Sequence, residues 1–594
     1  MSKEHLSAMI QESVQKFGDK TAMRYKEGGR WKTISYTELG EKIRATAKAL
    51  LEEGIGEGDM VGIFSQNRPE WAIADFAILS VNAVSVPVYA TNTAKQTEYI
   101  VNDAEIKIIF VGDQGQYDKV KSFAASQKQL KKIIVFDRNI KLHGAESICL
   151  VDFMKLGKKS SRDAEVDQKI SAGKADDVAT LIYTSGTTGD PKGAILTHAN
   201  FFNQFYYIDK DFSIGTRDRS LCFLPLSHAY ERMSSFYLFR CGAENNYLSN
   251  PKDVVEFMAE VKPTCMTSVP RLYEKIYATV CDKLEKAPPQ KKRMFNWAIR
   301  VGREYEYRKK GQKPVYPVLA LKHAIADKMV LSAVRAVVGG PKNFFSAGGA
   351  PLAREIEEFF FAAGLFVCQG YGLTETSPMA AANSPRAFKF GTVGKPILGC
   401  EIKIGEHGEI LVKGGNVMKG YYKKPKETEE AFVDGWFKTG DVGVIDEDGF
   451  LRITDRIKDL IITAQGKNVA PQHIEGVIAR DLFIEQVVTV GDKRKYITAL
   501  IVPSFGALEP YAREKNIRFS SREELVKKPE IVEFYRKRIR ELSVELANYE
   551  KIVNFKLMPR EFTQENGELT PTLKLKRKVI AENYKNMIDG MYDA

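Results

Sequence analysis

The chain has 594 residues and a formal net charge of +12, and 44% of its residues are hydrophobic. This length predicts more than one domain, and the balance of apolar and charged residues excludes a disordered or fibrous protein. A membrane span would need about 20 nearly uncharged residues, whereas the most apolar stretch, residues 71–90, is interrupted by Asp75, Asn82 and Pro87.

Cysteine and histidine usage narrows the class of protein further. The seven cysteines form no C-x-x-C pair, and the seven histidines show no zinc-ligand spacing. An odd number of scattered cysteines in a long chain favours reduced thiols, so we expect a cytoplasmic protein. The N-terminus lacks the apolar core of a secretory signal peptide. No nucleic-acid-binding motif is present, so the positive charge indicates a solvated surface or attraction to other anions, including the inner face of a membrane.

Short apolar runs alternate with amphipathic helical stretches over the first two-thirds of the chain. We predict buried strands at Met60–Ser65, Ile106–Val111, Lys132–Phe136, Thr180–Thr184 and Leu365–Gln369. We predict helices at Tyr36–Gly54, Val254–Val261 and Ala353–Gly364. This alternation is typical of parallel sheets covered by helices, so the predicted class is α/β.

The basic region Leu284–Gly340 interrupts this alternation. Within it, Lys291–Lys310 has an apolar stripe at helical spacing, formed by Met294, Ala298, Val301 and Tyr305, and surrounded by lysines and arginines. Two interpretations stay open: a surface helix packed on its own domain, or a helix that rests on an anionic membrane.

The pattern changes after about residue 389. Ile402–Ile404, Glu409–Val412 and Val442–Ile453 are short and turn-bounded, and Ile445–Phe450 reads as a hairpin with a glycine turn. We therefore predict a small antiparallel barrel over about residues 390–455, within an N-terminal domain of residues 1–455. Mixed α and β patterns return in residues 456–594, which we predict to be a second domain with strands at Val487–Val490 and Ile497–Val502 and a charged helix near Ser521–Leu546.

A glycine- and hydroxyl-rich loop carries the strongest chemical signal. It spans Leu181–Gly193, reads LIYTSGTTGDPKG, and follows an apolar strand. Glycines let the backbone N–H groups approach a ligand, hydroxyls add donors, and Lys192 adds positive charge, so the loop suits a polyphosphate. It is not a Walker loop, because no Gly-Lys-Ser/Thr sequence closes it.

From this loop onward the chain resembles the adenylate-forming, or AMP-binding, superfamily. Its motifs follow in order along nearly the whole chain: Ser346–Leu352 (SAGGAPL), Gln369–Thr376 (QGYGLTET), Trp436–Asp441 (WFKTGD), Asp455–Asp459 (DRIKD) and Gly466–Pro471 (GKNVAP). The resemblance implies a large N-terminal domain of two parallel α/β subdomains and a small antiparallel β-barrel, with a smaller, mobile α+β C-terminal domain. It also implies ATP, Mg²⁺ and coenzyme A as cofactor and co-substrates.

The resemblance assigns the nucleotide site to three groups of residues. The phosphate loop contributes Thr184, Ser185, Gly186, Thr187, Thr188, Gly189 and Lys192. The adenine side contributes Gly349, Ala350, Pro351, Tyr371 and Gly372, with the Tyr371 ring expected to stand exposed and to stack on the base, and the ribose side contributes Asp441 and Arg456. Glu375, beside Thr374, is the expected Mg²⁺ ligand, because Mg²⁺ takes few protein carboxylates together with phosphate oxygens. A helix N-terminal glutamate favoured by the macrodipole is the alternative for Glu375.

The C-terminal segment carries the catalytic lysine that the resemblance implies. Thr572-Leu573-Lys574 stands where many members have Ser-Gly-Lys, so Lys574 is the candidate and Lys576 the alternative. The resemblance makes Lys458 the hinge between the domains and Gly466 a contact to coenzyme A. We expect Thr184 and Thr374 to act with Lys574 and Glu375 on the charge that develops at the phosphate.

Two further segments are similar to the long-chain fatty acid–CoA ligase branch. His228, in Leu224–Arg232, is expected at the junction of acyl group and nucleotide, and Tyr273 is a candidate gate to an acyl tunnel; Leu284–Gly340 also resembles this branch. The expected reaction converts a long-chain fatty acid to its acyl adenylate and then to acyl-CoA. The alternatives are transfer to a carrier protein and a non-enzymatic nucleotide-binding regulator. We expect no nucleic-acid partner, and a homodimer and peripheral membrane association stay open.

Overall fold

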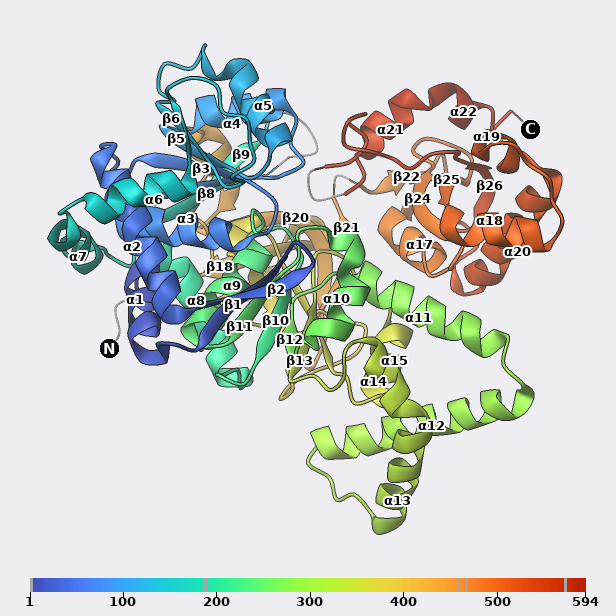
Figure 1. Ribbon diagram of the computed structural model, residues 1–594. Helices are drawn as coiled ribbons and strands as arrows, with labels where there is room; N and C mark the ends of the chain where they lie inside the picture. Colours follow the sequence, from blue (N-terminus) through green and yellow to red (C-terminus); the bar gives the residue numbers. More distant parts are fainter. Residues whose placement is uncertain (1–3, 185–189, 458, 466, 571–573, 594) are drawn as a thin grey trace.

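The computed structural model describes residues 4–184, 190–457, 459–465, 467–570 and 574–593. Two α/β layers and a small antiparallel sheet make up the larger part, and a separate C-terminal domain lies to one side of them (Figure 1). The predicted fold class is confirmed, and within the described residues no helix is both long and apolar enough to cross a membrane.

The first layer is a seven-stranded sheet in the order β7-β6-β5-β3-β4-β8-β9, parallel except at β9. Its strands are β3 (Met60–Phe64), β4 (Val84–Val88), β5 (Ile108–Val111), β6 (Lys132–Val135), β7 (Ser147–Cys149), β8 (Val178–Thr184) and β9 (Lys192–Thr197). Its helices are α1 (Leu6–Phe17), α2 (Tyr36–Glu52), α3 (Pro69–Ser80), α4 (Ala94–Asp103), α5 (Gln114–Ala124), α6 (Leu150–Lys159) and α7 (Asp163–Ala172).

Both faces of this sheet are covered, which explains its continuously apolar strands. In β5, Ile108 and Phe110 join the core under α2 and α3, while Ile109 and Val111 join the core under α4 and α5. The four predicted strands of this sheet and the predicted helix at Tyr36–Gly54 are all present, with ends shifted by a few residues.

The second layer contains two mixed sheets, in the orders β10-β11-β1-β2 and β12-β13-β14-β15-β16. The strands are β1 (Thr21–Glu27), β2 (Arg30–Ser35), β10 (Arg219–Cys222), β11 (Glu244–Tyr247), β12 (Cys265–Met266), β13 (Phe344–Ala347), β14 (Val367–Gly372), β15 (Met379–Ala382) and β16 (Lys395–Pro396). The helices are α8 (His198–Asp211), α9 (Ala229–Arg240), α10 (Val254–Val261), α11 (Pro270–Glu285) and α15 (Arg354–Ala362), with a short 3₁₀ turn, η1 (Pro251–Asp253). The predicted helices at Val254–Val261 and Ala353–Gly364 correspond to α10 and α15.

The small antiparallel sheet forms a half-barrel in the order β17-β18-β20-β19, with β21 paired to β20. Its elements are β17 (Cys400–Ile404), η4 (Glu406–Gly408), β18 (Glu409–Gly414), α16 (Pro425–Glu430), β19 (Phe432–Val433), β20 (Trp436–Ile445) and β21 (Leu451–Arg456). The predicted hairpin joins β20 to β21, and Gly449 adopts the positive φ of 80° that its turn requires.

The C-terminal domain has its own core around the three-stranded sheet β24-β25-β26. Its elements are β22 (Ile461–Ile462), β23 (Asn468–Val469), α17 (Pro471–Ile478), β24 (Ile484–Val490), β25 (Ile497–Pro503), α18 (Phe505–Glu514), α19 (Arg522–Leu525), α20 (Pro529–Leu542), η5 (Ser543–Glu545), β26 (Ile552–Leu557), α21 (Arg577–Asn583) and α22 (Lys585–Asp589). The prediction of one continuous helix near Ser521–Leu546 is wrong, because the structure has two helices there, α19 and α20. Pro529 starts α20 at its first turn and disfavours helical conformation in the residue before it, so the segment divides.

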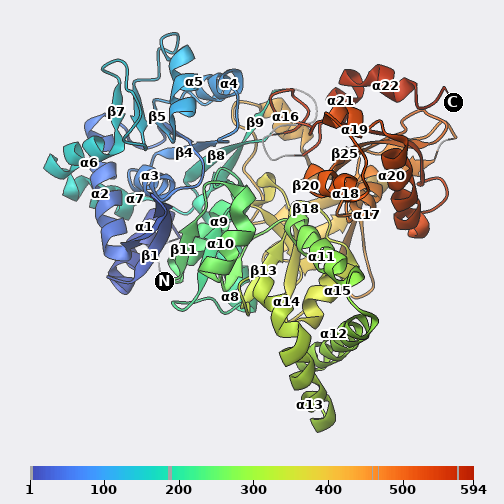
Figure 2. The ribbon, with the colours of Figure 1, turned by 45° about the vertical axis from the view of Figure 1, so that its right-hand side comes forward.

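The region Leu284–Gly340 forms a helical hairpin that projects from the body of the protein, away from the C-terminal domain (Figures 1 and 2). It contains α12 (Pro289–Lys310), α13 (Pro317–Ala326), the π-helical turn η2 (Asp327–Leu331) and α14 (Ser332–Val337). The predicted helix is therefore present. Its apolar stripe is not free for a membrane, because Met294, Ala298, Val301 and Tyr305 pack in a cluster with residues of α13 and η2.

Glu231 of α9 is a fully buried carboxyl group outside the predicted site. Its Oε2 accepts a hydrogen bond from the Thr267 hydroxyl at 2.9 Å, and burial raises the pKa of Glu231 from 4.5 to about 8. Between these values the folded state retains a proton that the unfolded chain has released, so the stability of the protein falls as pH rises through this window.

Glu231→Gln is expected to remove this pH dependence. The stability of the wild type should decline by up to about 1.4 kcal/mol per pH unit from this group, whereas glutamine has no proton to lose. The difference in Tm between variant and wild type should therefore widen from about pH 5 to pH 8 in favour of the variant. A pH-independent difference in Tm would show that Glu231 ionises normally.

Candidate nucleotide and acyl site

Glu375 lies at the centre of the predicted site. It belongs to the 3₁₀ turn η3 (Thr374–Thr376), which follows β14, and it is 8% exposed. Its Oε1 accepts hydrogen bonds from the Tyr421 hydroxyl at 3.0 Å and from the Thr184 hydroxyl, at the end of β8, at 3.4 Å. The carboxylate is thus held beside Thr184, the first of the phosphate-binding residues expected in this motif.

Tyr421 is a site residue that sequence reasoning missed. It lies 46 residues from Glu375 and reaches it because an isolated bridge pairs Tyr421 with Ala194 of β9. Lys192 extends its ammonium over the Tyr421 ring at 5.2 Å. The segment Met418–Tyr422 carries no motif of its own, so only the pairing with β9 identifies it.

Asp441 joins the predicted adenine and ribose residues. It pairs with Arg456 across β20 and β21, and Arg456 Nε donates to Asp441 Oδ1 at 2.7 Å. The Tyr371 hydroxyl donates to Asp441 Oδ2 at 2.8 Å. The expected exposure of the Tyr371 ring is wrong for this structure, since the residue is 9% exposed. The Tyr371 hydroxyl instead points toward the buried carboxylate of Asp441.

The other residues of the predicted adenine segment are accessible. Gly349, Ala350 and Pro351 follow β13 and are all exposed, and Gly349 has a positive φ of 84°. Gly372 ends β14, the strand that pairs with β13. The segment starts at Ser346, whose hydroxyl pairs with the Tyr230 hydroxyl.

Tyr273, the candidate acyl gate, is fully buried. Its hydroxyl donates to the Ser346 carbonyl at 2.9 Å, and its ring packs edge-on against Phe345 and Phe360. In this conformation Tyr273 is a core residue that supports the strand leading to the adenine segment. Opening as a gate would require loss of this hydrogen bond.

His228 caps the N-terminus of α9. Its Nδ1 accepts the backbone N–H of Tyr230 at 3.2 Å, which leaves the proton of the neutral ring on Nε2. Burial and the positive charge of Lys574 lower the pKa of His228 from 6.5 to about 4. The imidazole is therefore neutral at physiological pH and offers Nε2 as a donor.

A buried ion pair connects α9, which begins after His228, to α3, and a further hydrogen bond of its arginine reaches β8, which ends at Thr184. Arg232, one turn after His228, donates to both oxygens of Asp75 in α3, with Nε at 2.9 Å from Oδ2. Its Nη1 donates to the hydroxyl of Thr180 in β8 at 2.7 Å. One guanidinium thus connects the helix of His228 to the strand of Thr184.

Lys574 comes from the C-terminal domain and is brought to these residues. Its backbone N–H donates to Thr570 Oγ1 at 3.0 Å. The side chain keeps access to solvent, but the surrounding protein desolvates it: burial and Arg456 lower the pKa of Lys574, while Asp441 and Glu375 act in the opposite direction. The alternative, Lys576, directly precedes α21, and its N–H donates to the Glu568 carbonyl.

Side chains of α11 join the two domains. Arg271, in the first turn of α11, donates to the backbone carbonyls of Ala479 and Ile484 at 2.9 and 2.8 Å. Lys275, one turn later, forms an ion pair with Glu485 at 2.9 Å. These contacts hold the C-terminal domain in the orientation that directs Lys574 to Glu375 and Asp441.

Seven of the predicted residues lie outside the described residues. They are Ser185, Gly186, Thr187, Thr188 and Gly189 of the phosphate loop, the hinge residue Lys458 and the coenzyme A contact Gly466. The described residues on either side of the phosphate loop, Thr184 and Lys192, are register partners in β8 and β9.

The residues present suit a magnesium ion that is held mainly by its substrate. Within the described ranges, no group of three or more His, Cys, Asp or Glu residues could hold a metal ion. Glu375 provides one carboxylate and Thr184 one hydroxyl beside it. Mg²⁺ is commonly bound by one or two carboxylates with phosphate oxygens and waters, so this set fits it.

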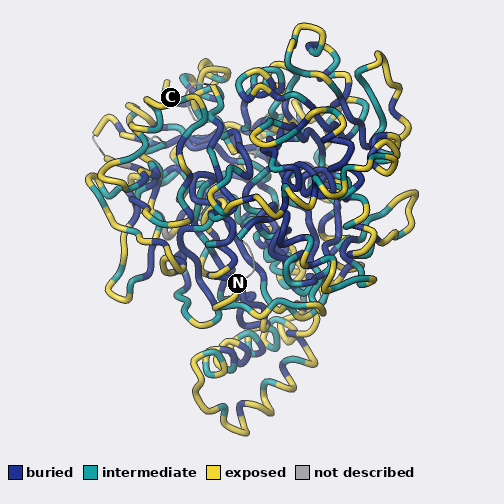
Figure 3. The backbone as a smooth tube through the Cα atoms, turned by 90° about the vertical axis from the view of Figure 1, so that its left-hand side faces the viewer, coloured by how far each residue is buried: buried dark blue, intermediate teal, exposed yellow. Residues whose placement is uncertain are grey.

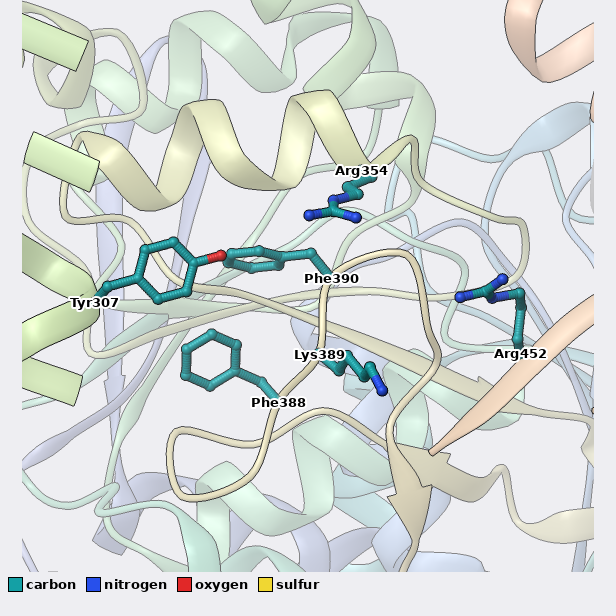
Figure 4. Close-up of a pocket in the computed structure, with 6 residues that line it drawn as sticks. All are labelled: Tyr307, Arg354, Phe388, Lys389, Phe390 and Arg452. Atoms are coloured by element: carbon teal, nitrogen blue, oxygen red, sulfur yellow. The ribbon is translucent and has the colours of Figure 1, made fainter. Parts of the chain in front are cut away.

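A pocket of about 230 Å³ is lined by residues that do not belong to the predicted site (Figure 4). Its lining combines aromatic and cationic side chains: Tyr307, Arg354, Phe388, Lys389, Phe390 and Arg452. Arg354 pairs with Glu358, and Lys389 pairs with Asp446 and Asp448, each at 2.8 Å. Two of the three cations are therefore already neutralised, and none of the predicted site residues lines this pocket.

Comparisons with known proteins identify the family of the chain. A family model described as AMP-binding enzyme matches residues 10–422, and one described as AMP-binding enzyme C-terminal domain matches residues 458–594. A long-chain-fatty-acid–CoA ligase of Mycobacterium bovis is 36% identical over 99% of this chain and 97% of its own length. Another from Xenopus laevis is 32% identical over 98% of this chain and 83% of its own length.

A solved structure shares the fold over the full chain. The adenylation domain of a carboxylate reductase from Mycobacterium chelonae matches with a TM-score of 0.77 and 22% identity, covering 99% of this chain and 91% of that one. The family models and the near-full-length relatives together show that this chain belongs to the AMP-binding enzyme family.

Proposed function

We propose that this protein activates a long-chain fatty acid with ATP and transfers the acyl group to coenzyme A. The observation that carries the proposal is the convergence of Lys574 from one domain with Glu375, Asp441 and His228 from the other. The named activity of relatives that are 30–36% identical over nearly the whole chain supports the substrate class.

In the first half-reaction, a carboxylate oxygen of the acid forms a bond to the α-phosphorus of ATP, and the bond to pyrophosphate breaks. Lys574, Thr184 and Thr374 stabilise the charge on the phosphorus oxygens. Neutral His228 donates from Nε2 to the reacting carboxylate or phosphate, because its Nδ1 is already engaged. Asp441 and Arg456 hold the ribose, and Gly349, Ala350, Pro351, Tyr371 and Gly372 surround the adenine. Mg²⁺ on Glu375 would neutralise phosphate charge.

In the second half-reaction, the sulfur of coenzyme A forms a bond to the acyl carbon, and the bond from that carbon to the phosphate oxygen of AMP breaks. AMP leaves, and the thiol proton passes to solvent. The C-terminal domain rotates about Lys458, which withdraws Lys574 and presents Gly466 to coenzyme A. Rotation would break the Arg271 and Lys275 contacts. The sequence-predicted division at residue 455 falls within β21, and we place the start of the mobile domain just after Arg456.

The acyl chain length is the first test. If the acyl chain enters an apolar tunnel, each buried methylene adds about 0.8 kcal/mol, or up to about fourfold in kcat/KM. We expect kcat/KM to rise from acetate to acids of about twelve carbons and longer, with coenzyme A as acceptor. A higher kcat/KM for acetate than for palmitate would contradict the long-chain assignment, and transfer only to a carrier protein would contradict the acceptor.

The same proposal places the protein in the cytoplasm, at the inner face of the membrane. Long-chain acids partition into bilayers, and the net charge of +12 favours an anionic surface. We therefore propose peripheral association with anionic lipid.

A further inference from the structure

One exposed face of α13 and η2, in the projecting hairpin, is apolar. Val318, Leu321, Ile325 and Met329 follow each other at helical spacing along α13 and η2 and are 65%, 65%, 46% and 53% exposed. Tyr316, just before α13, is 57% exposed. Exposed segments lie along the outer edge of the hairpin (Figure 3). A contiguous exposed apolar face of this kind marks an interaction site rather than ordinary surface.

The inward face of the same segment accounts for its fold without these residues. Leu319, Ala326, Val330 and Leu331 are buried against α12, and His323 stacks on Tyr305 with ring centroids 3.7 Å apart. Gly302 lets α12 approach α15, since a Cβ there would lie 2.1 Å from the Ala362 carbonyl oxygen. The buried face of α13 and η2 therefore holds the hairpin together. Within the described part of the chain, Val318, Leu321, Ile325 and Met329 do not belong to this packing.

The exposed charged residues of α13, η2 and α14 have one sign. Lys322 and Lys328 are the exposed charged residues between Pro317 and Val337, and the one acid there, Asp327, is half-buried and paired with Arg335. Lys313, just before α13, is also exposed. Among the ion pairs of the described residues, none involves Lys313, Lys322 or Lys328.

From these observations we infer that the face formed by Val318, Leu321, Ile325 and Met329, the α13 face, inserts into the interface of an anionic bilayer. An apolar helix face with lysines at its border matches acyl chains flanked by anionic headgroups. A second copy of this chain fits less well, because a symmetric contact would place the lysines of one α13 face beside those of the other. The inference rests on the proposed membrane association and replaces α12 with α13 as the contacting element.

The test is cosedimentation of the full chain with vesicles of phosphatidylcholine alone or mixed with phosphatidylglycerol. The wild type should bind the anionic vesicles and lose binding as salt is added. A variant with Leu321→Gln, Ile325→Gln and Met329→Gln should lose about a hundredfold in partition coefficient, the summed effect of three partly buried apolar side chains. Lys322→Gln with Lys328→Gln should lose about tenfold to thirtyfold and show a weaker salt dependence.

The matched control replaces equally exposed apolar residues far from the hairpin. Val544→Gln with Val553→Gln, at positions of the C-terminal domain that are 75% and 54% exposed, should bind vesicles like the wild type. All variants should keep wild-type kcat/KM for a water-soluble, medium-length acid, because the α13 face contains none of the site residues.

The outcomes separate the two proposals. If the wild type binds neither vesicle at low salt, the proposed membrane association is wrong. If the wild type binds and the triple glutamine variant binds equally well, the association stands but the α13 face is the wrong surface. If the wild type sediments as a dimer and the triple variant as a monomer, with unchanged vesicle binding, the face is a contact between copies.

Discussion

Replacing Lys574 with alanine is expected to slow acid-dependent exchange of pyrophosphate into ATP by about 10²–10³-fold, the scale for one positioned electrostatic group. The ammonium approaches Glu375 and Asp441 only through the orientation of the C-terminal domain. The same variant, given preformed acyl adenylate and coenzyme A, should form thioester at close to the wild-type rate. Rapid-quench measurement of each half-reaction separates the two effects.

Lys576→Ala is the matched control for this experiment, since it removes the same charge two residues away. It should leave pyrophosphate exchange nearly unchanged. If Lys576→Ala abolishes exchange and Lys574→Ala does not, the catalytic lysine has been assigned two residues too early. Equal loss of both half-reactions in Lys574→Ala would contradict a role confined to adenylation.

Glu375→Gln is expected to reduce kcat/KM by about 10²–10³-fold and to raise the Mg²⁺ concentration needed for half-maximal activity. Glutamine keeps the size of the side chain and an oxygen that can accept from Tyr421 and Thr184. The change therefore removes the charge and leaves the packing. Activity titrated with Mg²⁺ at saturating ATP measures both effects.

Tyr421→Phe provides the graded comparison. It removes one hydrogen bond, worth about 1 kcal/mol, from a carboxylate that stays charged, so a loss of about fivefold to tenfold in kcat/KM is expected. Wild-type activity and Mg²⁺ dependence in Glu375→Gln would show that the carboxylate is only a structural acceptor for Tyr421 and Thr184.

The pattern of apolar and polar residues along the chain predicted the helices and strands well, because buried positions are occupied by apolar residues. Strands covered on both faces, such as β3 and β5, read as unbroken apolar runs, and the antiparallel sheet read as short alternating ones. The order of the motifs identified the family. Neither the residue pattern nor the motif order shows which strands pair with each other. For example, the N-terminal strand β1 pairs with β11, which lies more than 200 residues later in the sequence.

The details of the site that sequence could not predict are long-range contacts. Tyr371 was expected to be exposed because its local segment ends a strand, and its burial follows from a hydrogen bond to Asp441, 70 residues later. Tyr421 was missed because its role arises from pairing with β9. For α12 the sequence left two interpretations open, and the packed surface helix is the one that the structure confirms. The apolar stripe of α12 is visible in the sequence, but periodicity does not reveal that α13 covers it.

Arg232 has a consequence for how the two half-reactions share one cleft. Its guanidinium is 1% exposed and bonds to both α3 and β8. A shift of β8, with Thr184 at its end, against α9, with His228 at its start, would therefore break a buried hydrogen bond. A shift of α3 against α9 would leave a charge buried and unpaired. This half of the cleft acts as a rigid template, whose dipoles need little reorganisation as charge moves during the reaction. The adaptability that two successive chemistries demand is then concentrated in the domain that carries Lys574.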